Sequence, residues 1–240
     1  MSTDQQPAHL YRRQLSLIAS LIFATALCAG LLALRIAYTR GVVFAGLLWN
    51  LFLAWVPMAS SLIAYNTFKR RFGLCTLIVI ASTFAWLLFF PNAPYLLTDI
   101  IHLRPSDAPV WFDLILLVAF AWTGTFLGLV SLYMMQSVVH RMAGTLTSWA
   151  FAVGTLAAGS FGIYLGRFLR WNSWDVFTQP RAILADIVHR LRHPFDNPQV
   201  FAFSILFFLF LMAAYWMLVA MMEFGRENQE RLDRVDGGAS

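Results

Sequence analysis

The residues best suited to chemistry lie in the segment Phe89–Leu103, which reads FFPNAPYLLTDIIHL between two strongly apolar stretches. Asp99 and His102 are three positions apart, so on a helix they share one face, with Tyr95 one turn before Asp99. A carboxylate beside an imidazole raises the proton affinity of the ring and fixes its orientation, which suits acid–base catalysis or metal binding. The alternative is a capped re-entrant turn in which Asp99 and His102 only pair locally.

A second polar cluster follows in residues 166–175, which read GRFLRWNSWD. Arg167 and Arg170 end an apolar run, where cations favour a helix C-terminus and can contact lipid phosphates. The tryptophans of this segment are typical of a membrane-interface belt. Asn172 and Asp175 add hydrogen-bonding groups with turn character, which an anchor does not require. The cluster is therefore either an interface anchor or part of a binding site that also includes Trp174.

A third segment, residues 180–193, predicts an amphipathic helix, with Pro180 suited to its first turn. Its basic residues and apolar stripe indicate a helix that lies in the plane of the lipid headgroups. His189 and His193 are four positions apart and could chelate a metal, but two histidines at this spacing specify little. We therefore prefer the interfacial helix and expect no metal site.

Composition places these segments in a membrane protein. Hydrophobic residues make up 60% of the 240 residues, charged residues make up 12%, and the mean hydropathy is +0.67. Runs without Asp, Glu, Lys, Arg or His are each about as long as the ~20 residues that cross a ~30 Å hydrocarbon layer as a helix. Because backbone groups in lipid must bond within the chain, we expect an all-α transmembrane helical bundle. The predicted spans, about six, are 15–34, 42–65, 73–90, 114–139, 142–166 and 198–222.

The remaining sequence leaves no room for a soluble domain, so we expect a single integral-membrane domain over residues 1–240 with a polar C-terminal tail at 223–240. The first run is long enough for a retained span rather than a cleaved signal. Cys28 and Cys75 lie inside apolar runs, which argues against a disulfide, and we expect no cofactor. The net charge of +5 comes from basic residues at span ends, so we exclude nucleic acid as a partner.

Two prolines interrupt the chain after the third run. Pro91 and Pro94 each disfavour the α region for the residue before them, so the helix is expected to end near Phe90 and Ala93 to be extended. Pro94 suits the first position of a new short helix, and Asn92 is placed to cap it. The sequence thus predicts a short re-entrant or interfacial segment near residues 91–103.

Both polar clusters fall on the same face of the membrane, because two spans separate the connections that contain them. Acidic residues gather in these two connections, and Asp99 or Asp113 is predicted to pair with Arg167 or Arg170. The positive-inside rule favours cytoplasmic termini once the long connection after the fifth span is left out of the comparison. No Asp, Glu, Lys or Arg lies inside the predicted runs, which argues against an ordinary proton-coupled transporter.

Small residues at intervals of four indicate close helix contacts. They are Gly124 with Gly128 in the fourth span, and Gly154, Ala158, Gly162 and Gly166 in the fifth. These faces suit contacts within the bundle or a homo-oligomer. Asn50, near the middle of the second span, is interpreted as an interhelical hydrogen-bonding residue.

The motifs PNAPYLLTDIIHL, WFDLILL and GRFLRWNSWD together resemble the bacterial integral-membrane family known as domain of unknown function 1361. The resemblance covers roughly Leu74 to Met222 and leaves the first two spans outside it. It implies a small polytopic membrane protein without an established activity. The motif positions that it implies are Pro91, Asn92, Pro94, Tyr95, Asp99, His102, Asp113, Arg167, Arg170, Asn172, Trp174 and Asp175.

Two classes of function follow. The first is a non-catalytic protein of the inner (plasma) membrane that binds a lipid headgroup or small anion through Arg167 and Arg170, as a transport or assembly component. The second is a membrane-interface hydrolase or transferase in which Asp99 and His102 supply a base and its orienting group or hold a metal. The sequence contains no serine elbow, H-E-x-x-H motif or Gly-rich phosphate loop, so we prefer the binding function.

Overall fold

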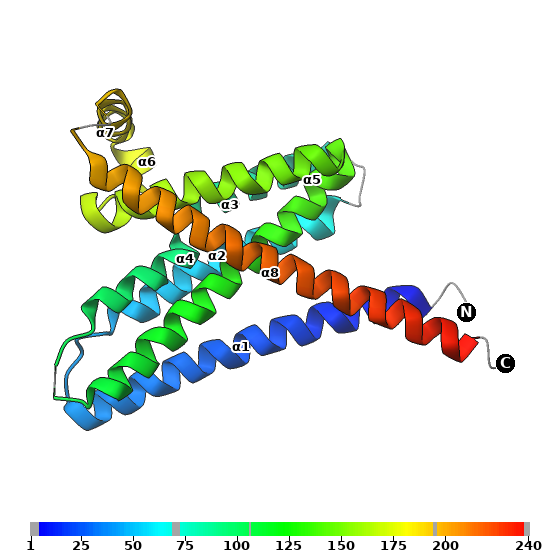
Figure 1. Ribbon diagram of the computed structural model, residues 1–240, viewed down its shortest axis with the longest axis horizontal. Coiled ribbons are helices and arrows are strands. Elements are labelled where there is room, and N and C mark those ends of the chain that lie inside the picture. The colour runs from blue at the N-terminus through cyan, green and yellow to red at the C-terminus, as the bar shows by residue number, and fades with distance from the viewer. Residues whose placement is uncertain (1–4, 69–72, 106, 194–195, 238–240) are drawn as a thin grey trace. The chain divides into compact units, whose positions relative to one another are not determined.

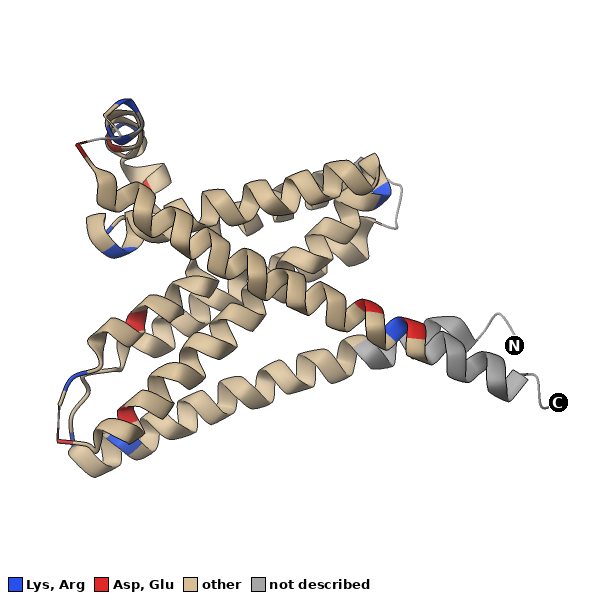
Figure 2. Ribbon diagram, viewed as in Figure 1, with Lys and Arg blue, Asp and Glu red and all other residues tan. Residues whose placement is uncertain are grey.

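The computed structural model describes residues 5–68, 73–105, 107–193 and 196–237, and within these ranges the chain forms helices and no strand (Figure 1). The elements are α1 (Gln5–Thr39), α2 (Gly46–Phe68), α3 (Gly73–Phe89), α4 (Asn92–Tyr95), the 3₁₀ helix η1 (Leu96–His102), α5 (Val110–Leu169), α6 (Asp175–Thr178), α7 (Pro180–Arg192) and α8 (Pro198–Gly237). In Figure 2 the charged residues that the structure describes lie mainly at or near helix ends.

Five helical stretches of the described chain are long and apolar enough to cross a membrane: Gln14–Thr39, Gly46–Phe68, Leu74–His102, Val110–Leu169 and Pro198–Asn228. The prediction of a helical membrane bundle is confirmed. The predicted amphipathic helix at 180–193 is α7. α8 continues through the described part of the predicted polar tail, 223–240, to Gly237.

The predicted fourth and fifth spans, 114–139 and 142–166, lie in the single element α5. A straight helix of its 60 residues would be about 90 Å long, three times the hydrocarbon thickness. Gly144 breaks it, with φ 81° and ψ −178°, a conformation open to glycine because it has no Cβ. Figure 1 shows α5 folding back on itself. α5 therefore consists of two helical limbs, one for each predicted span.

Packing divides the chain into two compact units, Met1–Ser131 and Leu132–Ser240. In the first unit, side-chain hydrogen bonds join α1 to its neighbours. The indole N–H of Trp55 donates to Thr25 Oγ1 at 3.1 Å, and Cys28 Sγ lies 3.4 Å from Thr123 Oγ1. Such bonds each contribute roughly 0.6 kcal/mol between helices in lipid. The prediction of one integral-membrane domain remains a prediction.

Gly124 and Gly128 let the first limb of α5 approach α4 and η1 closely. A Cβ on Gly124 would lie 2.4 Å from Leu96 Cδ1 and 2.6 Å from the carbonyl oxygen of Ala93. A Cβ on Gly128 would lie 3.1 Å from Ala93 Cβ. The predicted close contact is confirmed, and its partner is the PNAPYLL segment of the same chain.

The second unit is held together at Tyr215 of α8. Its hydroxyl donates to Gln136 of the first α5 limb, and its ring makes an edge contact with Trp149 of the second limb at 6.3 Å. Tyr164 and Val200 form a further buried cluster between α5 and the start of α8. These contacts bring three helical segments of the unit together.

Candidate functional site

The segment after α3 stays helical through its prolines. α3 ends at Phe89, as predicted, but Pro91 has φ −61° and ψ −25°, already in the helical region. Ala93 is helical rather than extended, and α4 begins at Asn92 instead of Pro94. The reason is that Pro94 falls in the first turn of α4, where a missing N–H costs no helical hydrogen bond.

Asn92 is the first residue of α4 rather than its N-cap, which is Pro91. Its Nδ2 instead donates to the carbonyl oxygen of Phe89 at 3.1 Å, which satisfies an end of α3. Tyr95 is the last residue of α4, and its carbonyl accepts a bond from Thr98 Oγ1 at 2.6 Å. In this structure both predicted site residues have roles in shaping the turn that leads into η1.

Asp99 is buried on η1, with 5% of its surface exposed. Its Oδ2 accepts a hydrogen bond from Asn50 Nδ2 on α2 at 3.2 Å. Residues three apart on a 3₁₀ helix lie nearly above one another, so η1 presents Asp99 and His102 in the same direction. The predicted interhelical role of Asn50 is confirmed, and its partner is the central carboxylate of the first motif.

A pocket of about 570 Å³ opens beside this pair. Its polar residues are Asn50, Asp99, His102 and Arg104, and we call it the polar pocket. Its other walls are Val43, Phe44, Gly46 and Leu47. Asp99 is buried, whereas His102 and Arg104 are exposed, so the cationic and imidazole groups are accessible while the carboxylate lies deeper. Sequence reasoning missed Arg104 because it lies one residue beyond the motif that drew attention.

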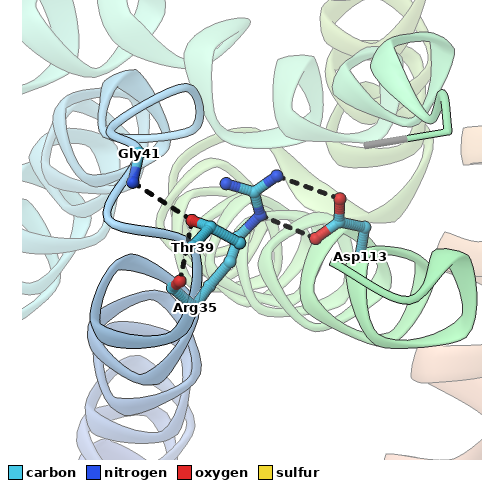
Figure 3. Close-up of polar contacts among 4 residues, drawn as sticks. All are labelled: Arg35, Thr39, Gly41 and Asp113. Atoms are coloured by element: carbon cyan, nitrogen blue, oxygen red, sulfur yellow. Dashed lines mark hydrogen bonds and ion pairs between the residues drawn. The ribbon is translucent and has the colours of Figure 1, made fainter. Parts of the chain in front are cut away.

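Asp113 has a buried partner that was not among its predicted partners (Figure 3). Arg35 of α1 holds it with two bonds, Nε to Oδ1 at 2.7 Å and Nη2 to Oδ2 at 3.1 Å. The side chains are 2% and 0% exposed, and the guanidinium also stacks over Phe44 at 4.4 Å from the ring centroid. We predicted that Arg167 or Arg170 would pair with Asp99 or Asp113, and the partner that the structure gives Asp113 is Arg35.

The buried pair lies at the ends of two long apolar helices. The first predicted run stops at residue 34 and the fourth starts at 114, but the spans Gln14–Thr39 and Val110–Leu169 include Arg35 and Asp113. The predicted charge-free runs exclude both residues, so the prediction that no charged group lies inside those runs stays a prediction. One signal was present in the sequence, since Arg35 and Asp113 each border an apolar run on the same predicted face.

The second motif lies in the other unit and bonds mainly within itself. Arg170 has φ 62° just after α5, and the N–H of Trp171 bonds Leu165 O at 3.3 Å, which closes the helix end. Asn172 donates to Asp175 Oδ2 through its backbone N–H at 2.7 Å, as expected of a turn. These bonds explain the polar residues locally.

The other two predicted residues of this motif lie close by. Arg167 is partly buried in the last turn of α5, and Trp174 precedes α6 with 38% of its surface exposed. A single site built from both motifs remains a prediction.

Trp171 connects this motif to α7. Its indole N–H donates to Asp186 Oδ2 at 2.8 Å, and Arg190 lies 3.1 Å from Asp186 Oδ1. The bond from Trp171, aided by Arg190, holds the pKa of the Asp186 carboxyl below its usual value despite some loss of hydration. In the part of the chain that the structure describes, no three His, Cys, Asp or Glu residues are grouped so that they could hold a metal ion.

Comparison with known proteins bears on the family. The family model described as "Protein of unknown function (DUF1361)" matches residues 49–214. The predicted resemblance is confirmed, but the match begins within α2 rather than at Leu74, so most of the second span is inside it. Arg35 and the rest of α1 lie outside the match. No curated protein and no solved structure matches the chain significantly.

Proposed function

Because this chain belongs to the DUF1361 family of proteins of unknown function, we propose a function from the polar pocket itself. The protein is a membrane protein that binds a lipid headgroup, or a small anion of the same chemistry, without catalysing a reaction. Binding of this kind suits a transport or assembly component. The observation that carries the proposal is that one pocket combines Asn50, Asp99, His102 and Arg104 with an apolar wall.

The arrangement of these groups matches a headgroup. Arg104 and His102 are exposed, so an incoming phosphate or carboxylate meets hydrogen-bond donors first. Asp99 is buried and already accepts a bond from Asn50, and a carboxylate can accept several bonds from hydroxyl or ammonium groups. Arg104 thus takes the anion-binding role predicted for Arg167 and Arg170, whose part in binding remains a prediction.

The test is lipid retention by the purified full-length protein. We expect mass spectrometry to find an anionic phospholipid at near-stoichiometric amount on the wild type. Arg104→Gln should lower the affinity for that lipid about tenfold or more, because a charge-assisted hydrogen bond contributes roughly 1.5–3 kcal/mol. Arg181→Gln, an exposed arginine of α7 that does not line the pocket, is the matched control. Equal lipid binding by both variants and the wild type would contradict the proposal.

The enzyme alternative also has a specific observation in its favour, since Asp99 and His102 line the same pocket. A carboxylate and an imidazole facing one cavity could act as a general base and its orienting group. Turnover of a bound phospholipid, lost in both Asp99→Asn and His102→Gln, would replace the binding function with hydrolysis or group transfer. A stoichiometric metal in the purified protein would point the same way.

Location and assembly belong to the same proposal. We infer that the protein lies in the inner (plasma) membrane with both termini in the cytoplasm. Of the small-residue faces, Gly124–Gly128 is covered by the chain's own α4 and η1. Gly154 is exposed, and a Cβ added there would meet no atom within 4 Å, so a homo-oligomer would use the face around Gly154 and Ala158.

A further inference from the structure

A second pocket, of about 300 Å³, lies where the last turns of α1 meet the start of α5. Tyr38, Trp111 and Phe112 supply rings to its wall, and Leu34 and Ala108 supply aliphatic surface. We call it the aromatic pocket. Tyr38 is 70% exposed and Trp111 is 63% exposed, so its rim faces the surroundings of the bundle.

The aromatic pocket and the polar pocket meet at one pair of side chains. Arg35 lines the aromatic pocket, Phe44 lines the polar pocket, and the Arg35 guanidinium carbon lies 4.4 Å from the centre of the Phe44 ring. Asp113 holds the guanidinium with two bonds and neutralises its charge. The two pockets are thus adjacent at this stacked pair, and the arginine that lines the aromatic pocket is already paired with a carboxylate.

The aromatic pocket is lined by residues at the ends of two apolar runs, which is where a spanning helix passes from hydrocarbon to headgroups. Leu34 is the last residue of the first apolar run, and Trp111 and Phe112 come just before the fourth. Trp and Tyr side chains favour this boundary because their rings are apolar and each has one polar group. A small free anion has no apolar group to pack against these rings, whereas the acyl chains of a lipid can do so.

We propose that one membrane lipid occupies both pockets, with its headgroup in the polar pocket and the start of an acyl chain in the aromatic pocket. The inference rests on the proposed function, since it requires the polar pocket to bind a headgroup. It goes further by naming the ligand as an intact lipid rather than a free anion. Van der Waals packing, rather than the hydrophobic effect, would favour binding of the acyl chain, because the lipid leaves a bilayer that is as apolar as the pocket.

The experiment compares a lipid with its own headgroup. Affinities of the full-length protein in detergent are measured for dioleoyl phosphatidylglycerol and for water-soluble glycerophosphoglycerol. Ala108→Phe fills the aromatic pocket, and Trp111→Ala, a change at an exposed ring, removes part of its wall without disturbing buried packing. Gly46→Leu fills the polar pocket, where a Cβ would meet nothing within 4 Å.

We expect Ala108→Phe and Trp111→Ala each to weaken lipid binding about tenfold and to leave glycerophosphoglycerol binding unchanged, while Gly46→Leu weakens both. If Trp111→Ala leaves lipid binding as in the wild type, or weakens both ligands equally, the two-pocket assignment is overturned and the headgroup site stands. If Gly46→Leu leaves both ligands bound normally, or the wild type binds neither, the proposed function itself fails.

Discussion

At the scale of single residues, the feature that most separates this structure from its sequence is the pairing of Arg35 with Asp113. Both side chains are almost fully buried, and a bidentate geometry satisfies the carboxylate from two nitrogens. A buried ion pair contributes little net stability compared with apolar residues of similar volume, yet either charge left alone is costly. The pair therefore fixes the end of α1 against the start of α5. Its arginine stacks on Phe44, which lines the polar pocket.

We predict that Arg35→Met and Asp113→Leu will each lower the free energy of unfolding by about 3–5 kcal/mol, because each leaves a buried charge without its partner. The double variant should lose much less than the sum of the two. SDS titration of the detergent-solubilised proteins measures the unfolding free energy of the wild type, the two single variants and the double variant, which together form a double-mutant cycle. Arg40→Met, at an exposed position in the following loop, is the control. Additivity within about 0.5 kcal/mol would show that the two residues do not interact.

A pH prediction follows from Asp186. Its folded pKa lies below the ordinary value of about 3.9, so its contribution to stability is fully present above that value and is lost as the pH falls through the folded pKa. We expect hydrogen exchange of the α7 backbone, corrected for intrinsic rates, to increase below about pH 4 as the bond to Trp171 is lost. Asp186→Asn should exchange faster at neutral pH and show no such acid step. An acid step of the same size in Asp186→Asn would rule out this carboxylate as its origin.

At the scale of helices, apolar runs predicted the helices that are long and apolar enough to cross a membrane, because length and missing charge determine which segments can be buried in lipid. The predicted run ends at residue 139, but the first limb of α5 continues beyond it, because His140 and Arg141 do not prevent a helix. The limb ends at Gly144, whose backbone conformation the run could not predict. Proline rules predicted the end of α3, but they did not predict that Ala93 is helical. In this conformation the Ala93 backbone packs against Gly124 of α5. The pairing of Arg35 with Asp113 was missed for a different reason, since two residues 78 positions apart leave no local sequence pattern that joins them.

We predict opposite outcomes for one substitution at two glycines of α5. Gly124→Ala places a Cβ 2.6 Å from a backbone oxygen of Ala93, which cannot move away without shifting α4, so we expect a loss of about 1–3 kcal/mol of unfolding free energy. Gly154→Ala meets nothing within 4 Å and should be neutral or stabilising by up to about 1 kcal/mol. SDS titration compares the two proteins directly. Equal stability of both variants would contradict the close contact between α5 and the PNAPYLL segment.

At the scale of the whole molecule, the chain is a helical membrane protein whose described charged groups lie mainly near helix ends (Figure 2). In the first unit, the polar pocket, the aromatic pocket and the buried ion pair lie close together in the connections before α2 and α5. Which side of the membrane they face depends on the orientation of the chain. That orientation could be predicted only from loop charges, which are nearly balanced between the two sides.

Reporter fusions test the orientation. Fusions after Phe68 and at the C-terminus should report the cytoplasm, whereas fusions near Asp107 and Asn197 should both report the exterior, because two crossings separate the latter pair. Paired phosphatase and fluorescent-protein reporters give a positive signal on each side. Different locations for Asp107 and Asn197 would refute the shared face of the two motifs, while inversion of all four would reverse only the proposed orientation.

The ion pair between α1 and α5 also has a consequence for biogenesis. Arg35 and Asp113 are 78 residues apart, and synthesis at about 5–20 residues per second would separate their appearance by about 4–16 seconds. During that interval Arg35 lacks the Asp113 carboxylate that neutralises it in the folded protein, and an unpaired charge is costly at membrane depth. We expect the nascent α1 to remain shallow, with Arg35 among the headgroups, and to reach its final depth only after the start of α5 is made. Of the helices that the structure describes, α1 would then be made before its partner α5 and would settle only after it.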